Sequence, residues 1–143
     1  MFLGEFEHSI DQKNRLRIPP KFRKDFSEGA VVTKGNDGCL FLVAKTQFSN
    51  LFQNLNSLPL FDSKLQMPVR MLFSSACEVE EDNQGRFLLP QNLKAFAGIT
   101  KDVIFVGVGN RVELWSKERW QDYSSKANSN FDQILQSLGE YGI

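Results

Sequence analysis

Two stretches of the sequence place an aspartate four residues before an arginine and then end on a proline. The first runs from Asp11 through Arg15 to Pro19, and the second runs from Asp82 through Arg86 to Pro90. A carboxylate beside a guanidinium forms an ion pair, and the pair can also hold the arginine ready for a phosphate or a base edge. Two interpretations are open: a pair that only pins a turn, and a pair that orients the arginine toward a ligand.

The sequence contains few residues suited to covalent catalysis or to metal binding. His8 is the only histidine, and Cys39 and Cys77 are the only cysteines, so one chain cannot supply four zinc ligands. The acidic run Glu78–Asp82 fits no calcium loop, and Gly107–Gly109 lacks the third glycine and the following helix of a dinucleotide loop. We therefore expect no enzymatic activity, no cofactor and no metal.

Local charge separates the two stretches, although the whole chain has a formal net charge of zero. Residues 7–26 hold six basic and three acidic side chains, whereas residues 78–97 hold two basic and four acidic ones. A polyanion prefers the first stretch. We expect the second stretch, including Arg86, to serve structure or contacts between subunits. The predicted DNA-binding residues are Lys13, Arg15, Arg17, Lys21, Arg23 and Lys24.

The two stretches belong to a longer internal repeat. Residues 10–19 align with residues 81–90 at an offset of 71, and residues 38–45 align with residues 110–117 at an offset of 72. Two matched blocks in the same order, similarly spaced in each copy, indicate a duplicated structural unit.

Each copy predicts a β-hairpin. In the first copy the extended segment 4–10 pairs with 15–18, and in the second copy 77–81 pairs with 86–89. The turns centre on Asn14 and Gly85, the residue types that best tolerate positive φ. We expect Asp11, Asn14, Asp82, Gly85 and Arg86 to shape and orient the turns.

Helices and a second strand pair follow each hairpin. Phe22 and Phe26 predict a short amphipathic helix, which residues 93–97 repeat in the second copy. Strand pairs over 30–33 with 40–43 and over 102–107 with 111–115 come next. Longer helices follow, capped by Thr46 and by Ser116, and the second extends to Leu138.

The connector between the copies also predicts a helix. It can begin at Asp62 or Ser63, and Pro68 falls inside its pattern. Either the helix kinks at Pro68 or a new helix starts there.

These elements predict an α+β protein that is mainly β. A single copy cannot cover its own apolar sheet face, so we expect two copies to close one pseudo-two-fold β-barrel without exposed edges, with flanking helices. The expected organisation is a first module at 1–55, a helical connector at 56–76, a second module at 77–125, and a C-terminal helix and tail at 126–143. No apolar run reaches the length of a membrane span, so we expect a cytoplasmic location.

The sequence resembles the MraZ family, whose double-split barrels consist of two tandem AbrB-like modules. The resemblance covers nearly the whole chain. In the stretch from Asp11 to Pro19, Asn14 stands where the family usually has glycine. Besides the two stretches that contain the aspartate and the arginine, the resemblance rests on Met1–Glu5, Asp37–Leu40, Phe73–Ala76, Gly107–Arg111 and Leu114–Ser116.

The resemblance implies a transcriptional regulator associated with the nucleoid. It implies binding of double-stranded DNA at short direct repeats upstream of its own gene, in the division and cell-wall gene cluster. It also implies a ring-shaped homo-oligomer, in which the acidic second module of one subunit can face the basic first module of the next. Two alternatives stay open: a ring-forming scaffold barrel that binds a protein partner, and, more distantly, a carboxylate-metal hydrolase.

Overall fold

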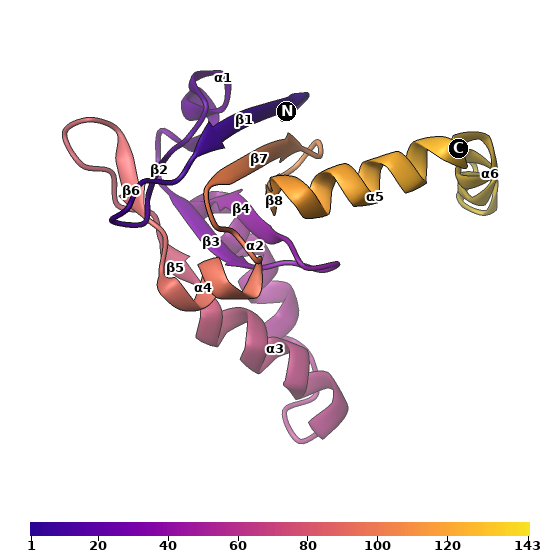
Figure 1. Cartoon of the computed structure of the whole chain (residues 1–143). Coiled ribbons are helices and arrows are strands. Elements are labelled where there is room, and N and C mark those ends of the chain that lie inside the picture. Colours follow the sequence, from indigo (N-terminus) through magenta and orange to yellow (C-terminus); the bar gives the residue numbers. More distant parts are fainter.

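The computed structural model describes all 143 residues and shows a mixed α+β protein (Figure 1). The strands are β1 (Glu5–Ser9), β2 (Arg15–Arg17), β3 (Ala30–Lys34), β4 (Leu40–Ala44), β5 (Cys77–Glu78), β6 (Arg86–Leu88), β7 (Asp102–Gly107) and β8 (Val112–Ser116). The helices are α1 (Pro20–Arg23), α2 (Lys45–Asn56), α3 (Ser63–Ser75), α4 (Gln91–Phe96), α5 (Lys117–Ser129) and α6 (Phe131–Gln136), with 3₁₀ turns η1 (Lys24–Phe26) and η2 (Ser137–Tyr141).

The sheet order reflects the internal repeat. Six antiparallel strands lie in the order β1-β7-β8-β4-β3-β5, so that matching strands of the two copies take matching places on either side of the β8–β4 pair. The predicted pairing of β3 with β4 and of β7 with β8 is confirmed.

Strands are exchanged between the copies, so the predicted pairing within each hairpin is wrong apart from one bridge, between Glu81 and Phe87 in the second. β1 of the first copy pairs with β7 of the second, β5 of the second pairs with β3 of the first, and β2 pairs with β6. Each predicted turn does form, but its two arms separate beyond the tip. The exchange places Leu16 opposite Phe87, both about 1% exposed, in one core shared by the copies.

The predicted closure into a barrel is not confirmed. β1 and β5 stand at the two ends of the six-stranded sheet, and β2 with β6 forms a separate two-stranded ladder. Only the tip of the second turn connects that ladder to the segment after β5, through the bridge between Glu81 and Phe87 and the hydrogen bond from the Asp82 backbone N–H to the Arg86 carbonyl. The sheet therefore stays open.

One core of 19 buried residues joins both copies. Phe2 and Phe26 stack with ring centroids 4.8 Å apart, and the edge of Phe22 meets Phe2 at 5.5 Å. From the second copy, Phe87 and Phe105 are at most 1% exposed. Each fully buried aromatic ring contributes about 1.5–3 kcal/mol of hydrophobic stabilisation, so the shared core ties the copies together.

Helix starts agree with the sequence in two of three cases. Ser116 accepts a hydrogen bond from the Arg119 backbone N–H (3.2 Å), and Asp62 caps α3. The predicted cap by Thr46 is wrong. Lys45 is the first residue of the helix and donates its backbone N–H to the carbonyl of Gly29, so Ala44 rather than Thr46 is the N-cap and Thr46 lies within the first turn. Pro68 lies inside α3, which continues through it.

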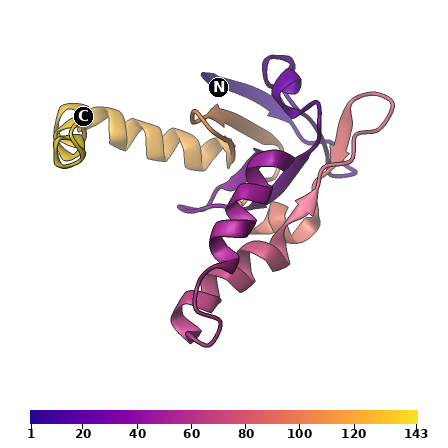
Figure 2. The ribbon, with the colours of Figure 1, turned by 180° about the vertical axis from the view of Figure 1, so that it is seen from behind.

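Two helical arms extend from the sheet. The antiparallel pair α2 and α3 projects at one side, and α5 carries α6 away at another (Figures 1 and 2). The prediction of a single C-terminal helix reaching Leu138 is wrong, because the helical backbone is interrupted at Asn130 (φ −120°, ψ 25°). Asn128-Ser129-Asn130 are poor helix formers whose side chains compete for backbone groups, and Ser129 Oγ donates to the Lys126 carbonyl. No helix has the length and apolar character to cross a bilayer.

Candidate nucleic-acid interface

The first turn is built around the carboxylate of Asp11. Its Oδ1 accepts hydrogen bonds from the backbone N–H groups of Lys13 (2.9 Å) and Arg15 (2.8 Å). Its Oδ2 accepts a hydrogen bond from Arg15 Nε (2.7 Å). Asn14 takes the positive φ that the sequence predicted, at 61°. Because Asp11 engages only Nε, both terminal nitrogens of Arg15 are left without an intramolecular partner.

The second turn repeats this geometry. Asp82 Oδ1 accepts the backbone N–H groups of Gln84 (2.8 Å) and Arg86 (3.0 Å), and Oδ2 accepts Arg86 Nε at 3.0 Å. Gly85 has a φ of 75°. Both ion pairs predicted from the sequence are therefore present, each within one copy.

The hydrogen bonds stabilise the charged form of both aspartates. The backbone N–H of Arg15 lowers the pKa of Asp11, and the backbone N–H of Arg86 lowers the pKa of Asp82. The adjacent guanidinium lowers both pKa values further. Each carboxylate therefore stays ionised and keeps its arginine oriented at neutral pH.

Pairing of β2 with β6 gathers arginines from both copies on one side of a ribbon. Arg17 lies directly opposite Arg86, and Arg15 lies opposite Leu88. Side chains alternate along a strand, so these four share one side, while Leu16 and Phe87 face the core. Two guanidinium groups directly opposite each other repel, and an anion between them would relieve that repulsion.

A basic residue of each copy also contacts the turn of the other copy. Arg23 Nη2 pairs with Glu81 Oε2 at 2.9 Å, and its guanidinium lies against Gly85. At the matching position of the second copy, Lys94 Nζ donates to Asn14 Oδ1 at 2.9 Å. The predicted DNA-binding residue Arg23 is thus already engaged by the opposite turn.

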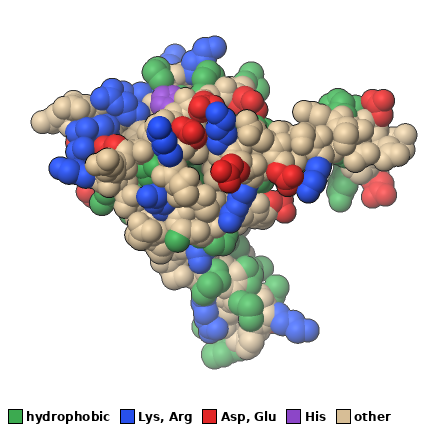
Figure 3. Space-filling model, in the orientation of Figure 1, with side chains coloured by type: hydrophobic (Ala, Val, Ile, Leu, Met, Phe, Trp, Pro, Cys, Tyr) green, Lys and Arg blue, Asp and Glu red, His purple; other side chains and the backbone are tan.

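The other predicted basic residues are exposed. Arg17, Lys13 and Lys24 are exposed and have no carboxylate partner, and Lys21 lies 6.0 Å from the ring of Phe6. Lysine and arginine side chains gather over the end of the molecule that carries β2 and β6 (Figure 3). Of the predicted set, Arg15 and Arg17 lie on the ribbon and Lys13 in the turn before it, whereas Lys21 belongs to α1 and Lys24 to η1.

The sequence also matches a known protein family. The sequence model of the family described as “MraZ protein, putative antitoxin-like” matches residues 1–70 and 72–138. The chain belongs to the MraZ family. The two matched stretches begin 71 residues apart, which is the offset between the two aspartate-arginine boxes.

Similar relatives in the MraZ family span the whole chain. Proteins named “Transcriptional regulator MraZ” from Syntrophomonas wolfei subsp. wolfei, Clostridium beijerinckii and Acetivibrio thermocellus are each 46% identical over 143 residues. The alignments cover 100% of this chain and 100% of each relative. None of these names denotes an enzyme.

Two contacts of this surface were not predicted from the sequence. Sequence reasoning assigned Arg86 to structure or to contacts between subunits, and it did not predict that strand exchange sets Arg86 opposite Arg17. It gave Lys94 no role, although Lys94 holds Asn14. The repeat carried a signal for Lys94, because Arg23 and Lys94 occupy equivalent positions 71 residues apart. No local signal pointed to the pairing of β2 with β6, since the two strands are distant in sequence.

Proposed function

We propose that the protein is a sequence-specific DNA-binding transcriptional regulator without enzymatic activity. The observation that carries this proposal is the ribbon of β2 and β6, which presents Arg15, Arg17 and Arg86 on one solvent-facing side. A two-stranded ribbon fits the major groove of B-DNA, and arginine is the usual partner of guanine there. The names of the relatives support the same role.

Arg15 is the best placed residue for a bidentate contact in this proposal. Asp11 fixes its Nε, which leaves the two terminal nitrogens free to face O6 and N7 of a guanine or two phosphate oxygens. Arg17, Lys13, Lys21 and Lys24 would mainly neutralise phosphates and set the salt dependence.

The second copy plays a smaller part in the proposed contact. Arg86 shares the ribbon face, but Glu81 and Asp82 lie beside it and make its surroundings less attractive to a polyanion. Arg23 mainly holds the second turn through Glu81.

The proposed operator consists of short direct repeats upstream of the protein's own gene, in a division and cell-wall gene cluster. A ring-shaped homo-oligomer would engage several repeats together in the cytoplasm at the nucleoid. Linked contacts bind far more tightly than one contact alone.

A salt-titrated gel shift tests the proposal. The probe is the DNA upstream of the protein's own gene, and a shuffled duplex of equal length and composition is the control. We expect tighter binding to the upstream DNA, with affinity falling steeply as salt rises. Equal binding of both duplexes, or none of either, would reject specific DNA recognition and favour the scaffold that binds a protein partner.

A further inference from the structure

Three hydrogen bonds fasten the residue before Arg15, Asn14, to the second copy of the repeat. The Asn14 carbonyl accepts a hydrogen bond from the Leu89 backbone N–H at 2.8 Å. Its Oδ1 accepts a hydrogen bond from Lys94 Nζ at 2.9 Å, and its Nδ2 donates one to Gln91 Oε1 at 3.1 Å. We call the two side-chain contacts, made by Gln91 and Lys94 of α4, the α4 clamp.

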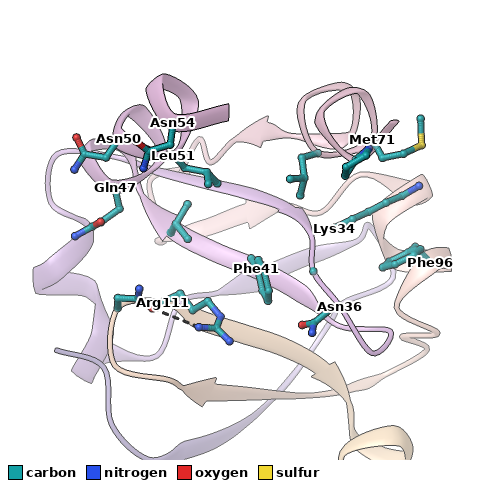
Figure 4. A pocket seen from close by; sticks show the side chains of 15 residues that line it. Lys34, Asn36, Phe41, Gln47, Asn50, Leu51, Asn54, Met71, Phe96 and Arg111 are labelled. Atoms are coloured by element: carbon teal, nitrogen blue, oxygen red, sulfur yellow. Dashed lines mark hydrogen bonds between the residues drawn. The ribbon is translucent and has the colours of Figure 1, made fainter. Parts of the chain in front are cut away.

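Helix α4 is a firm support for this clamp. Its Leu93 and the following Ala97 are fully buried in the core that both copies share. At the far end of the helix, Lys34 Nζ lies 5.0 Å from the centroid of the Phe96 ring, and the Phe96 carbonyl accepts a hydrogen bond from Arg119 Nη1 at 3.0 Å. Figure 4 shows Phe96 close to Lys34 at one side of a hollow of about 1000 Å³. Because the core and these contacts fix α4, the helix can hold the turn in place.

The equivalent residue of the second turn, Gly85, makes none of these contacts. Gly85 has no side chain to accept or donate a hydrogen bond, and its carbonyl receives none from Ile18, the residue equivalent to Leu89. Asn14 has a left-handed φ of 61°, a conformation that glycine adopts at the lowest cost. A glycine would therefore suit the first turn better by its backbone alone, and what asparagine adds is its side chain.

The two turns also differ in the charge of the residues that hold them. On the second turn, the carboxylate of Glu81 neutralises Arg23 at a distance of 2.9 Å. At the position equivalent to Glu81 the first copy has Ile10, which is buried. Lys94 therefore bonds to the neutral amide oxygen of Asn14. The α4 clamp thus holds the first turn without adding a carboxylate, which would repel phosphate groups beside the DNA-facing arginine.

We propose that Lys94 and Gln91 are positioning residues for DNA recognition. This inference rests on the proposed function, and it makes them act on Arg15 through Asn14. Asp11 orients the Arg15 side chain within the turn, whereas the α4 clamp fixes the turn itself on the body of the protein. Arg15 follows Asn14 directly, so a fixed Asn14 sets the direction in which Arg15 leaves the turn. An arginine held in one direction distinguishes base edges better than one on a mobile turn.

A double-mutant cycle on DNA affinity tests the α4 clamp in the full-length protein. The variants are Lys94→Met, Asn14→Gly and the two combined. Lys94→Met removes the donor and keeps a long side chain, and Asn14→Gly removes both bonding groups while suiting the positive φ. Lys64→Met is the matched control for loss of one positive charge, because Lys64 is exposed on α3, outside the ribbon. Gel shifts compare the upstream duplex with the shuffled duplex at several salt concentrations.

The cycle separates positioning from charge. We expect Lys94→Met to weaken binding to the upstream duplex about tenfold, the size of a coupled contact. Binding to the shuffled duplex should change no more than it does with Lys64→Met. In the Asn14→Gly background, replacing Lys94 should have little further effect on the preference for the upstream duplex, because the bond is already absent. Circular dichroism and size-exclusion chromatography check the fold and the oligomer size of every variant.

Gln91→Ala weakens the α4 clamp without changing any charge. Gln91 is exposed, so this variant should keep the fold. We expect it to lower the preference for the upstream duplex by a smaller factor than Lys94→Met. It decides the question if Lys94→Met does not fold, because an unchanged preference would then reject the role of the clamp.

Three further outcomes would overturn the inference. Equal losses for both duplexes, with a salt slope lower by about 1 for each contact, would make Lys94 an ordinary phosphate contact. Losses that simply multiply in the combined variant would show that Lys94 does not act through Asn14. An unchanged preference in a folded Lys94→Met would leave the clamp with a structural role only. These results reject the inference alone, whereas a wild type that binds both duplexes alike rejects the proposed function and this role with it.

Discussion

At the scale of single residues, the two aspartates do the same structural work with different consequences. Asp11 and Asp82 each accept two backbone N–H groups and one arginine Nε. Around Arg15 the remaining charge is basic, and around Arg86 it is acidic. One turn design thus presents two arginines with unequal attraction for a polyanion.

Replacing Arg15 tests this difference. Arg15→Ala should weaken specific DNA binding by about 1–3 kcal/mol for each subunit contact, because it removes a bidentate donor. Folding and oligomer size should be unchanged, since Asp11 keeps its two backbone hydrogen bonds. Gel shift and size-exclusion chromatography measure the two properties, with Lys126→Ala on α5 as a control for loss of one positive charge.

Arg86→Ala belongs in the same series. We expect it to reduce stability or assembly more than DNA affinity, because Asp82 pairs with it beside the acidic Glu81. If Arg15→Ala binds the upstream DNA normally while a folded Arg86→Ala does not, the roles of the two turns are reversed.

The aspartates also predict how stability depends on pH. Folding lowers the pKa of Asp11 and of Asp82, so their ionised forms stabilise the fold above the unfolded value of about 3.9. That contribution is lost as the pH falls through the lower, folded pKa. The double variant Asp11→Asn/Asp82→Asn should therefore have a lower melting temperature than the wild type near neutral pH. Its melting temperature should fall less than that of the wild type as the pH is lowered. Thermal melts from about pH 7 to about pH 3 measure this; parallel curves for variant and wild type would contradict it.

At the scale of elements, turns and strand positions could be predicted from the sequence, but strand partners could not. The positive φ of Asn14 follows from local residue chemistry, and so does the cap at Ser116. Pairing of β1 with β7 joins residues about a hundred positions apart, and no local pattern encodes it. The predicted helix to Leu138 failed for a different reason, because its apolar spacing continues through Asn130 while the backbone does not.

The second turn offers a test of how turns and helices hold each other. A Cβ atom on Gly85 would lie 2.8 Å from Arg23 Nη1, and the φ of 75° disfavours any side chain. Gly85→Ala should cost about 1–2 kcal/mol of folding free energy from backbone strain, and should also displace Arg23 from Glu81. Urea unfolding measures the cost. Asn14→Gly is the comparison, because it removes the same kind of strain but loses the hydrogen bonds to Lys94 and Gln91.

At the scale of the whole molecule, strand exchange makes the two copies one folding unit. Three of the ladders, β1 with β7, β2 with β6 and β3 with β5, join the copies directly, and β4 with β8 joins them at the centre of the sheet. The core of 19 residues draws on both copies. A separated copy would lose these ladders and expose its half of that core.

Separating the copies should therefore abolish folding. We expect the fragments Met1–Gln53 and Ser74–Ile143 to be unfolded or insoluble alone. The first keeps only the pairing of β3 with β4 and the second keeps only that of β7 with β8, apart from the bridge at Glu81. A two-stranded hairpin without a covered face is at best marginally stable in water. Amide NMR spectra of each fragment measure this directly, with the full-length chain as the folded reference. A well-dispersed spectrum from either fragment alone would show that one copy can cover its own sheet, and the exchange of strands would then be a contact between two finished domains rather than a condition for folding.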